Sequence, residues 1–334
     1  MINRHKTKVL ISASIILSLL ILAGAASVNY TSTEEKYSNP VLVETIKPKA
    51  HKGIVTPFVV EFGIGDPTVI SHDGKYYLYP TGDQYSYYVY ISSDLINWKK
   101  GPKVFTSAES GAWAPDVFYN PDDKKFYLYY TVNRKIGVAV ADRPDGTFKD
   151  LNPLIDNAID AHMFLDNGRY YLYYATYPGF RIYVQPMESP VKKKEEPIEI
   201  ISPTKAWEKK RAAITEAPWM LKHNDTYYLL YSGGGADSQD YAIGYATSKH
   251  PTGPFTKYKA NPIIKKGAGI FGPGHASVTK DGKGKMWMVY HQQNDETIGW
   301  NRIICINPLW FDDNGVLHGK ASRAIAQTAP VVEK

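Results

Sequence analysis

Cysteine is nearly absent from this 334-residue chain, in which Cys305 stands alone. A single thiol excludes an intrachain disulfide. Its neighbours are apolar, so residues 303–306 are predicted to form a buried strand, which argues against a nucleophilic role for the thiol. No cysteine follows the apolar run near the N-terminus either, and this excludes a lipoprotein anchor.

Net charge is also low. The formal charge is +6, and Arg4, Lys6 and Lys8 supply half of it before the first acid, Glu34, so the rest of the chain carries about +3. This is too little for the electrostatic surface of a nucleic-acid-binding protein, and no nucleic-acid partner is expected. Residues 192–196 mix lysine and glutamate and are predicted to form a solvated loop.

The N-terminal segment has the features of a secretory signal peptide. After the basic start come an apolar run at residues 9–22 and an A-x-A-like cleavage site at Ala23 and Ala25. The alternative is an uncleaved anchor, because the run through Val28 is about long enough to span a bilayer. We assign residues 1–28 to this signal peptide or anchor and the polar residues 29–55 to a leader. A secreted, periplasmic or cell-surface protein is predicted, with membrane contact only through an uncleaved N-terminal segment.

Five stretches with a common strand-turn-strand pattern fill most of the remaining chain. In each, a polar residue is followed 10 or 11 residues later by an aromatic-rich strand. These polar residues are spaced 50, 44, 56 and 59 residues apart, at Asp66, Asp116, Asp160, Glu216 and His275. Such spacing suits a repeated unit of about four strands.

One four-stranded unit cannot bury its own faces, so several units must pack side by side. Radial packing predicts an all-β fold, a five-bladed β-propeller that forms a single catalytic domain over residues 56–334. Tandem β-sandwiches are the competing architecture. They would not obviously bring the leading residue of every repeat to one place, whereas a propeller points each innermost strand at the central axis. Most of the 26 tyrosines are expected on strands, where tyrosine is favoured.

Three of the leading residues, Asp66, Asp160 and Glu216, are acids that a propeller would place around one axial cavity. Clustered buried carboxyl groups raise one another's pKa, so stability alone does not favour them. The alternative is that they cap hairpins or pair with lysines, which suits one isolated acid better than three at equivalent positions. Two carboxyl groups in unlike environments across a cavity suit glycosidic-bond hydrolysis, one as acid and the other as base or nucleophile.

Specific motifs surround these residues: Asp66-Pro67, Trp113-Ala114-Pro115-Asp116-Val117, Ile159-Asp160-Ala161-His162, Thr215-Glu216-Ala217-Pro218-Trp219 and Gly272-Pro273-Gly274-His275. Together they closely resemble glycoside hydrolase family 43 over roughly residues 56–330. The resemblance implies a five-bladed propeller enzyme that acts with inversion on arabinose- and xylose-containing plant polysaccharides and oligosaccharides.

The resemblance also implies a role for each acid. Asp66 would be the general base that activates water, Glu216 the general acid that protonates the leaving oxygen, and Asp160 a residue that holds and tunes Glu216. Inversion requires the base and acid carboxyl groups to stand roughly 6.5 to 9.5 Å apart. His275 matches a family histidine near the axis that is often associated with calcium through water. Since calcium prefers oxygen ligands, we expect at most one structural calcium ion there.

Several residues are candidates for contact with the sugar. Arg302 matches a family arginine that contacts the sugar near the acid, with a rim salt bridge as the alternative. His162, in the third motif, is a further candidate. Aromatic rings pack on the C–H faces of sugars, which favours Trp113, Phe271 and Tyr177, with packing at the rim or between blades as the alternative.

A short chain with no appended carbohydrate-binding module predicts a monomeric enzyme that trims chain ends, an α-L-arabinofuranosidase or β-xylosidase. Its partner would be a plant cell-wall oligosaccharide or polysaccharide. An endo-α-1,5-L-arabinanase is the alternative, although Ala161 replaces the proline of many relatives and residues 175–180 differ from the Ser-Trp-Ser-Gly-type loop of that branch. A non-catalytic carbohydrate-binding propeller is a further alternative, but the presence of all three acids argues against it.

Overall fold

The computed structural model describes residues 35–46 and 62–332. The predicted signal peptide or anchor, residues 1–28, lies outside these ranges. Within them, no helix is both long enough and apolar enough to cross a bilayer.

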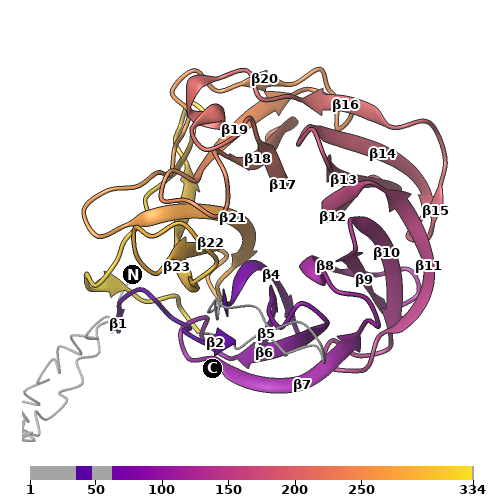
Figure 1. Cartoon of the computed structure of the whole chain (residues 1–334), viewed down its shortest axis with the longest axis horizontal. Helices are drawn as coiled ribbons and strands as arrows, with labels where there is room; N and C mark the ends of the chain where they lie inside the picture. The colour runs from indigo at the N-terminus through magenta and orange to yellow at the C-terminus, as the bar shows by residue number, and fades with distance from the viewer. Residues whose placement is uncertain (1–34, 47–61, 333–334) are drawn as a thin grey trace, which may run out of the picture. The chain divides into compact units, whose positions relative to one another are not determined.

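Five antiparallel sheets form the blades of a propeller, shown in Figure 1, and the first strand of each blade is the innermost. Blade one comprises β4 (Gly65–His72), β5 (Lys75–Thr81), β6 (Ser86–Ser92) and β7 (Lys99–Thr106). Blade two comprises β8 (Trp113–Asn120), β9 (Lys125–Val132), β10 (Lys135–Ala141) and β11 (Lys149–Asp156). Blade three comprises β12 (Ala158–Asp166), β13 (Arg169–Thr176), β14 (Ile182–Ser189), β15 (Lys192–Lys193) and β16 (Ile198–Ile201).

Blade four comprises β17 (Thr215–His223), β18 (Thr226–Gly233), β19 (Ala242–Ser248) and β20 (Thr256–Lys257). Blade five comprises β21 (Phe271–Lys280), β22 (Met286–Gln293), β23 (Arg302–Phe311) and β24 (Leu317–Gly319). The innermost strands contact one another in the closed order β4, β8, β12, β17, β21 and back to β4. This ring confirms the predicted all-β, five-bladed propeller over tandem sandwiches.

The tyrosines of the second strands join neighbouring blades. Tyr79 donates a hydrogen bond to the carbonyl of Pro144 in blade two, at 2.6 Å, and Tyr129 donates one to Pro190 in blade three, at 2.8 Å. Tyr173 repeats the contact with a carbonyl of blade four. These rings are fully buried between the blades. Such positions need an aromatic body and a polar tip, which explains part of the high tyrosine content.

The described N-terminal residues pack against blade five. Strand β1 (Lys36–Tyr37) pairs with β25 (Gln327–Thr328), and β2 (Thr45–Ile46) pairs with β3 (Phe62–Gly63). Between β1 and β2, the buried Asn39 side chain binds both the N–H and the carbonyl of Ile306. The predicted leader, residues 29–55, therefore differs from the structure: its described part, 35–46, belongs to the same compact unit as the propeller.

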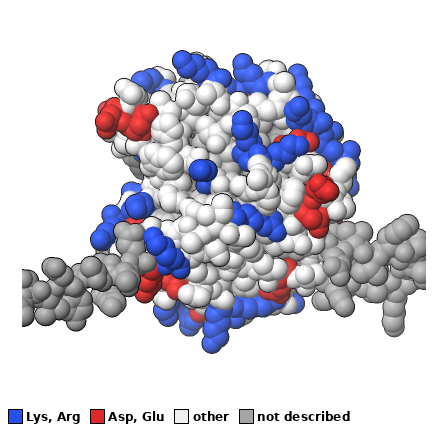
Figure 2. All heavy atoms as spheres, turned by 90° about the vertical axis from the view of Figure 1, so that its left-hand side faces the viewer, with Lys and Arg blue, Asp and Glu red and all other residues white. Residues whose placement is uncertain are grey.

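The structure also bears on two smaller predictions. Cys305 is fully buried in β23, as predicted. Residues 192–196 are exposed, although the first two form β15. On the face in Figure 2, Lys and Arg side chains are spread over the middle and the edges, with smaller groups of Asp and Glu among them.

Every innermost strand has a bulge close to its first residues, and this feature places the functional side chains. The register against the second strand shifts there in all five blades. At each bulge one residue has positive φ, between 38° and 57°: Asp66, Ala114, Asp160, Ala217 and His275. Bulges re-aim side chains and recur beside active sites.

The register corrects the predicted equivalence of the three acids. Asp66 and Asp160 both occupy the positive-φ position, but Glu216 lies one residue earlier, because Ala217 has that conformation in blade four. Asp116 pairs with Tyr129, as Thr68 pairs with Tyr79, so it lies beyond the bulge. Blade two has a turn two residues longer than that of blade one, so an offset of 10 residues there falls beyond the bulge. Blade four has the same turn length as blades one and three, so the same offset falls on Ala217 and not on Glu216.

Candidate active site

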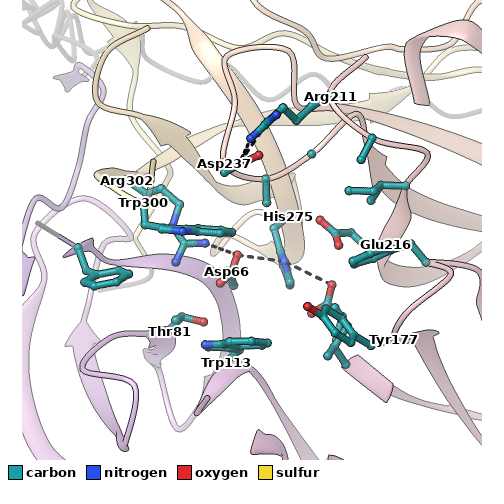
Figure 3. A pocket seen from close by; sticks show the side chains of 18 of the residues that line it. Asp66, Thr81, Trp113, Tyr177, Arg211, Glu216, Asp237, His275, Trp300 and Arg302 are labelled. Atoms are coloured by element: carbon teal, nitrogen blue, oxygen red, sulfur yellow. Dashed lines mark hydrogen bonds and ion pairs between the residues drawn. The ribbon is translucent and has the colours of Figure 1, made fainter. Parts of the chain in front are cut away.

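A cavity of about 630 Å³ opens beside the first residues of the innermost strands. Seven of the nine predicted site residues line it: Asp66, Trp113, Asp160, Tyr177, Glu216, His275 and Arg302. They come from all five blades, so the ring itself brings them together. Figure 3 shows the carboxyl groups of Asp66 and Glu216 on either side of the His275 ring.

Cationic and hydrogen-bonding groups surround Asp66. Its Oδ1 accepts a hydrogen bond from Arg302 Nη1 at 2.7 Å and lies 3.2 Å from His275 Nδ1. Burial would raise the pKa of Asp66, but Arg302 and His275 outweigh it and hold that pKa well below its usual range. The backbone N–H of Asp66 donates to His291 Nδ1 at 3.1 Å, and burial and Arg302 lower the pKa of His291, so this ring is neutral. Asp66 is therefore an ionised carboxylate.

Two glycines make room for Arg302. An added Cβ at Gly65 would lie 2.3 Å from Arg302 Cζ, and one at Gly63 would lie 2.0 Å from the Arg302 carbonyl oxygen. The arginine can therefore reach Asp66 only where these positions lack side chains. Sequence analysis expected Arg302 near the acid, whereas the structure places its guanidinium beside Asp66, at 3% exposure, so it is not a rim salt bridge.

The opposite environment surrounds Glu216. Its carboxyl group is buried, and burial followed by the negative charge of Asp160 raises the pKa of Glu216 to about 8. The buried Tyr241 hydroxyl lies beside it without reaching a well-formed hydrogen bond. Glu216 therefore keeps its proton at neutral pH and can donate it.

Asp160 and His275 lie between these two groups. Asp160 Oδ2 accepts a hydrogen bond from the Ala217 N–H at 3.0 Å, which ties it to the bulge that carries Glu216. Burial raises the pKa of the Asp160 carboxyl group, and the negative charge of Asp66 raises it further. Burial opposes charge on His275, but the carboxylates of Asp66 and Asp160 outweigh it and raise the pKa of that imidazole. The cationic form of His275 is therefore favoured, and the carboxyl groups of Asp66 and Asp160 face its ring.

Aromatic side chains form much of the cavity wall. The ring centroids of Trp113 and Tyr177 lie 6.5 Å apart, and Phe180 packs edge-on against Tyr177 at 5.2 Å. Across the cavity, the Trp300 ring covers the Arg302 guanidinium at 5.2 Å. Phe180 and Trp300 were not predicted from the sequence, although Trp300 stands only two residues before Arg302 and that proximity was the available signal.

The structure does not bring His162 and Phe271 into the cavity, which corrects both predictions. His162 is the first paired residue beyond the bulge of β12. Its ring is buried and stacks on Trp219 with centroids 4.1 Å apart. Phe271 opens β21 four residues before His275, and the positive φ of Gly272 turns the chain between them. His162 therefore belongs to the framework around the site.

A charged pair that was not predicted from the sequence also lines the cavity. Arg211 precedes β17, and Asp237 lies in the loop between β18 and β19. Arg211 Nε and Nη2 each lie 3.4 Å from Asp237 Oδ2. Neither residue occupies a repeat-equivalent position, so the repeat pattern contained no signal for them.

The calcium prediction concerns His275. Within the described ranges, no three His, Cys, Asp or Glu side chains are grouped so that they could hold a metal ion. The His275 Nδ1 atom is turned toward Asp66 and Asp160, and calcium prefers six to eight oxygen ligands. The protein side chains here do not form such a cage by themselves, and calcium stays a prediction.

Comparisons with known proteins agree with this geometry. The model of glycosyl hydrolases family 43 matches residues 56–317. The crystal structure of a thermostable family-43 glycoside hydrolase aligns with a TM-score of 0.77 and 34% identity, over 89% of this chain and 100% of that chain. Beta-D-galactofuranosidase xynD of Aspergillus niger is 29% identical over 283 residues, which cover 75% of this chain and 80% of that protein. A xylosidase/arabinosidase of Bacteroides ovatus is 28% identical over 315 residues, with 75% and 93% covered.

The matched region contains blades one to four, blade five as far as the first residue of β24, and all of the carboxyl groups described above. The chain therefore belongs to glycosyl hydrolases family 43 and is a hydrolase of O-glycosidic bonds.

Proposed function

We propose that the protein is an inverting, exo-acting glycosidase that removes α-L-arabinofuranosyl or β-D-xylopyranosyl units from plant cell-wall oligosaccharides or polysaccharides. The observation that carries this proposal is the opposed protonation of two carboxyl groups in one cavity. Asp66 is held ionised and Glu216 is held protonated. Such a division between two carboxyl groups identifies the base and the acid of a glycosidase.

The reaction follows from these protonation states. Asp66 accepts a proton from water as the water oxygen bonds to the anomeric carbon. The bond between that carbon and the leaving oxygen breaks, and the Glu216 proton passes to the leaving oxygen. Water enters opposite the leaving group, so the product has inverted configuration. Solvent then restores the proton of Glu216 and removes that of Asp66.

Three neighbouring groups hold this arrangement. Arg302 and His275 fix the orientation of Asp66 and keep it charged. Asp160 favours the protonated form of Glu216 and is tied to the same bulge. Because each contact is already made without substrate, little reorganisation is needed during the reaction.

The size of the cavity supports exo action. At about 630 Å³ it lies within the range of roughly 300–1,000 Å³ of small-molecule pockets. Trp113, Tyr177 and Trp300 offer faces on which a sugar ring can stack. An endo-α-1,5-L-arabinanase, which must bind a chain on both sides of the cleaved bond, is the second candidate.

Two aryl glycosides test the proposal directly. The protein without residues 1–28 should release 4-nitrophenol from the α-L-arabinofuranoside, the β-D-xylopyranoside or both. Asp66→Asn is the matched control, since it removes the base, which every substrate requires, but keeps the shape. Proton NMR of the first-formed sugar should show the inverted anomer. A retained anomer would contradict the assignment of Asp66 as base.

Other substrates separate the alternatives. Turnover of debranched arabinan without turnover of either aryl glycoside would favour the endo enzyme. Oligosaccharide binding with no sugar released from any substrate would favour a non-catalytic binding propeller.

We also propose export from the cytoplasm, which rests on residues 1–28 alone. Mass spectrometry of the protein recovered from the culture medium would reveal cleavage after the Ala23-Gly24-Ala25 stretch. An intact N-terminus in the membrane fraction would show the anchored alternative.

A further inference from the structure

The cavity contains two separate sets of charged residues. The inner set is buried, with Asp66, Glu216 and Arg302 between 3% and 7% exposed. The outer set is Arg211 and Asp237, whose side chains are 49% and 25% exposed. The reaction described above uses only the inner set. The outer pair lies at the upper side of the cavity in Figure 3, away from Trp113 and Thr81.

The outer pair is held in place by its backbone. The Arg211 N–H donates to the Gly234 carbonyl at 3.0 Å, and the Asp237 carbonyl accepts from the Gly299 N–H at 2.8 Å. An added Cβ at Gly235 would lie 2.8 Å from Arg211 Cβ and Cγ, so the glycine lets the arginine pass close to this loop. Blade four supplies the loop and blade five fixes it.

The side chains of the pair are only weakly engaged with each other. Both nitrogen–oxygen distances are 3.4 Å, beyond the usual range of about 2.7–3.2 Å for a good hydrogen bond. An ion pair as exposed as this one contributes little to stability. Arg211 therefore retains donors, and Asp237 retains acceptor capacity, toward the space that they line.

The position of the pair indicates which part of a substrate it meets. In an exo-acting enzyme, the terminal sugar enters first and lies deepest, beside Asp66 and Glu216. The sugar on the other side of the cleaved bond then lies at the more exposed part of the cavity. Arg211 is also only five residues before Glu216, which protonates the oxygen of that second sugar.

We infer that Arg211 and Asp237 jointly bind the leaving-group sugar and select a neutral sugar with adjacent free hydroxyl groups. The inference rests on the proposed exo-acting function. Arg211 donates to one hydroxyl oxygen and Asp237 accepts from the neighbouring hydroxyl. The pair carries no net charge, so it gives a uronic acid no electrostatic advantage over a neutral sugar.

The test compares two leaving groups in the same enzyme. One is 4-nitrophenol, which lacks the paired hydroxyl groups, and the other is the second sugar of 1,5-α-L-arabinobiose or 1,4-β-D-xylobiose. Arg211→Ala and Asp237→Asn should each lower kcat/KM for the disaccharide about tenfold, as expected for loss of a charge-assisted hydrogen bond. The loss with the aryl glycoside should stay below threefold. The double variant should lose little more kcat/KM for the disaccharide than either single variant, because both residues bind the same sugar.

Arg143→Ala is the matched control, since it removes another arginine–aspartate pair, with Asp145, at the surface away from the cavity. Arg143→Ala should leave kcat/KM unchanged for both substrates. Equal losses with both leaving groups would show that Arg211 and Asp237 only support the loop structure, and would overturn the inference. Unchanged disaccharide turnover would overturn it as well. Faster hydrolysis of a substrate with a uronic acid leaving group would contradict the preference for a neutral sugar.

A binding measurement keeps this inference separate from the proposed function. In Glu216→Gln protein, calorimetry should show that Arg211→Ala weakens disaccharide binding about tenfold and methyl glycoside binding less than threefold. If this difference in binding were found but the wild-type protein hydrolysed no substrate, the proposed function would be overturned and the role of the pair would stand. Normal turnover with no such difference would overturn the role of the pair alone.

Discussion

The two sides of the active site contain the same functional group in opposite surroundings. On one side, blades one and five place a guanidinium and an imidazole against Asp66. On the other, blades three and four bury Glu216 beside a second carboxyl group, Asp160. Both carboxyl groups are almost completely buried, so burial alone does not distinguish them. The difference shows that neighbouring charge, supplied by different blades, decides which carboxyl group loses its proton.

This comparison also shows what the propeller contributes. Each blade supplies one or two residues at the axis, and the bulges turn them toward the same cavity. Leu78, Leu128 and Leu172 are fully buried in hydrophobic clusters between neighbouring blades. The framework is therefore repeated while the axial residues differ, so the chemistry can be asymmetric on a nearly symmetric fold.

The largest expected effect is loss of activity when either carboxyl group becomes an amide. Asp66→Asn removes the base, so kcat/KM should fall on the order of 10²–10⁴-fold with every substrate. Glu216→Gln removes the acid, so the loss should be similar for a disaccharide but smaller for the 4-nitrophenyl glycoside, because 4-nitrophenolate leaves with little need of a proton. Steady-state kinetics with both substrates measures the contrast.

The exposed Asp156, paired with Lys135, provides a control for the same chemical change. Asp156→Asn should leave both rates unchanged. If Asp66→Asn instead showed the dependence on the leaving group and Glu216→Gln did not, the two roles would have to be exchanged.

A smaller effect tests the cationic side alone. Gly65→Ala places a Cβ where the Arg302 guanidinium lies, so the guanidinium must leave Asp66. Loss of this charge-assisted hydrogen bond should lower kcat/KM about 10- to 100-fold. Because Arg302 lowers the pKa of Asp66, its displacement should also move the acidic limb of the pH–rate profile to higher pH.

Gly267→Ala is the matched glycine control, since its added Cβ would lie 3.9 Å from Ile270 and meet no strain. A Gly65→Ala enzyme with an unchanged acidic limb would mean that Arg302 does not set the charge of Asp66.

The features of this site that repeat along the chain could be predicted from the sequence, and those that do not repeat could not. The five aromatic strands and the three acids recur at intervals, so the ring, the cavity and the opposed acids could be predicted before the structure. Spacing alone placed Glu216 one position wrong, because the residue of positive φ in blade four is Ala217.

The remaining differences arise from loops and from side-chain direction. Trp300, Arg211 and Asp237 lie outside the repeated strands, and only the folded chain places them at the cavity. His162 is in a characteristic motif, yet the strand beyond the bulge turns it into the core against Trp219. Residues of one motif therefore do not share one function when a bulge separates them.

The acidic side is tested by the alkaline limb of the pH–rate profile. Glu216 must be protonated, so activity should fall as the pH rises through its pKa of about 8. The charge of Asp160 raises that pKa, so Asp160→Asn should move the alkaline limb to lower pH, by about 1 unit or more. The acidic limb depends on Asp66 and should move much less. Rates at saturating and at low substrate, measured from pH 3 to 10, would reveal both limbs. Equal movement of both limbs would contradict the separation of the two sides.

The smallest effect is on stability, where the two isosteric changes should have opposite signs. The folded-state pKa of Glu216 exceeds its ordinary value of 4.5, so its contribution to stability is present below pH 4.5 and is lost as the pH rises toward 8. Glu216→Gln mimics the protonated form, so at pH 9 its Tm should exceed that of the wild type by roughly 2–4 °C for each kcal/mol regained, with little difference at pH 5.

Asp66→Asn should instead lower Tm at both pH values. Asp66 is ionised throughout this range, and the amide leaves the Arg302 guanidinium buried without its carboxylate. Removing one partner of a buried ion pair costs about 3–5 kcal/mol. Differential scanning calorimetry of the three proteins at pH 5 and pH 9 makes the comparison. A gain at pH 9 in both variants would mean that Asp66 and Glu216 carry the same unfavourable charge, and that the difference in their surroundings does not control their protonation.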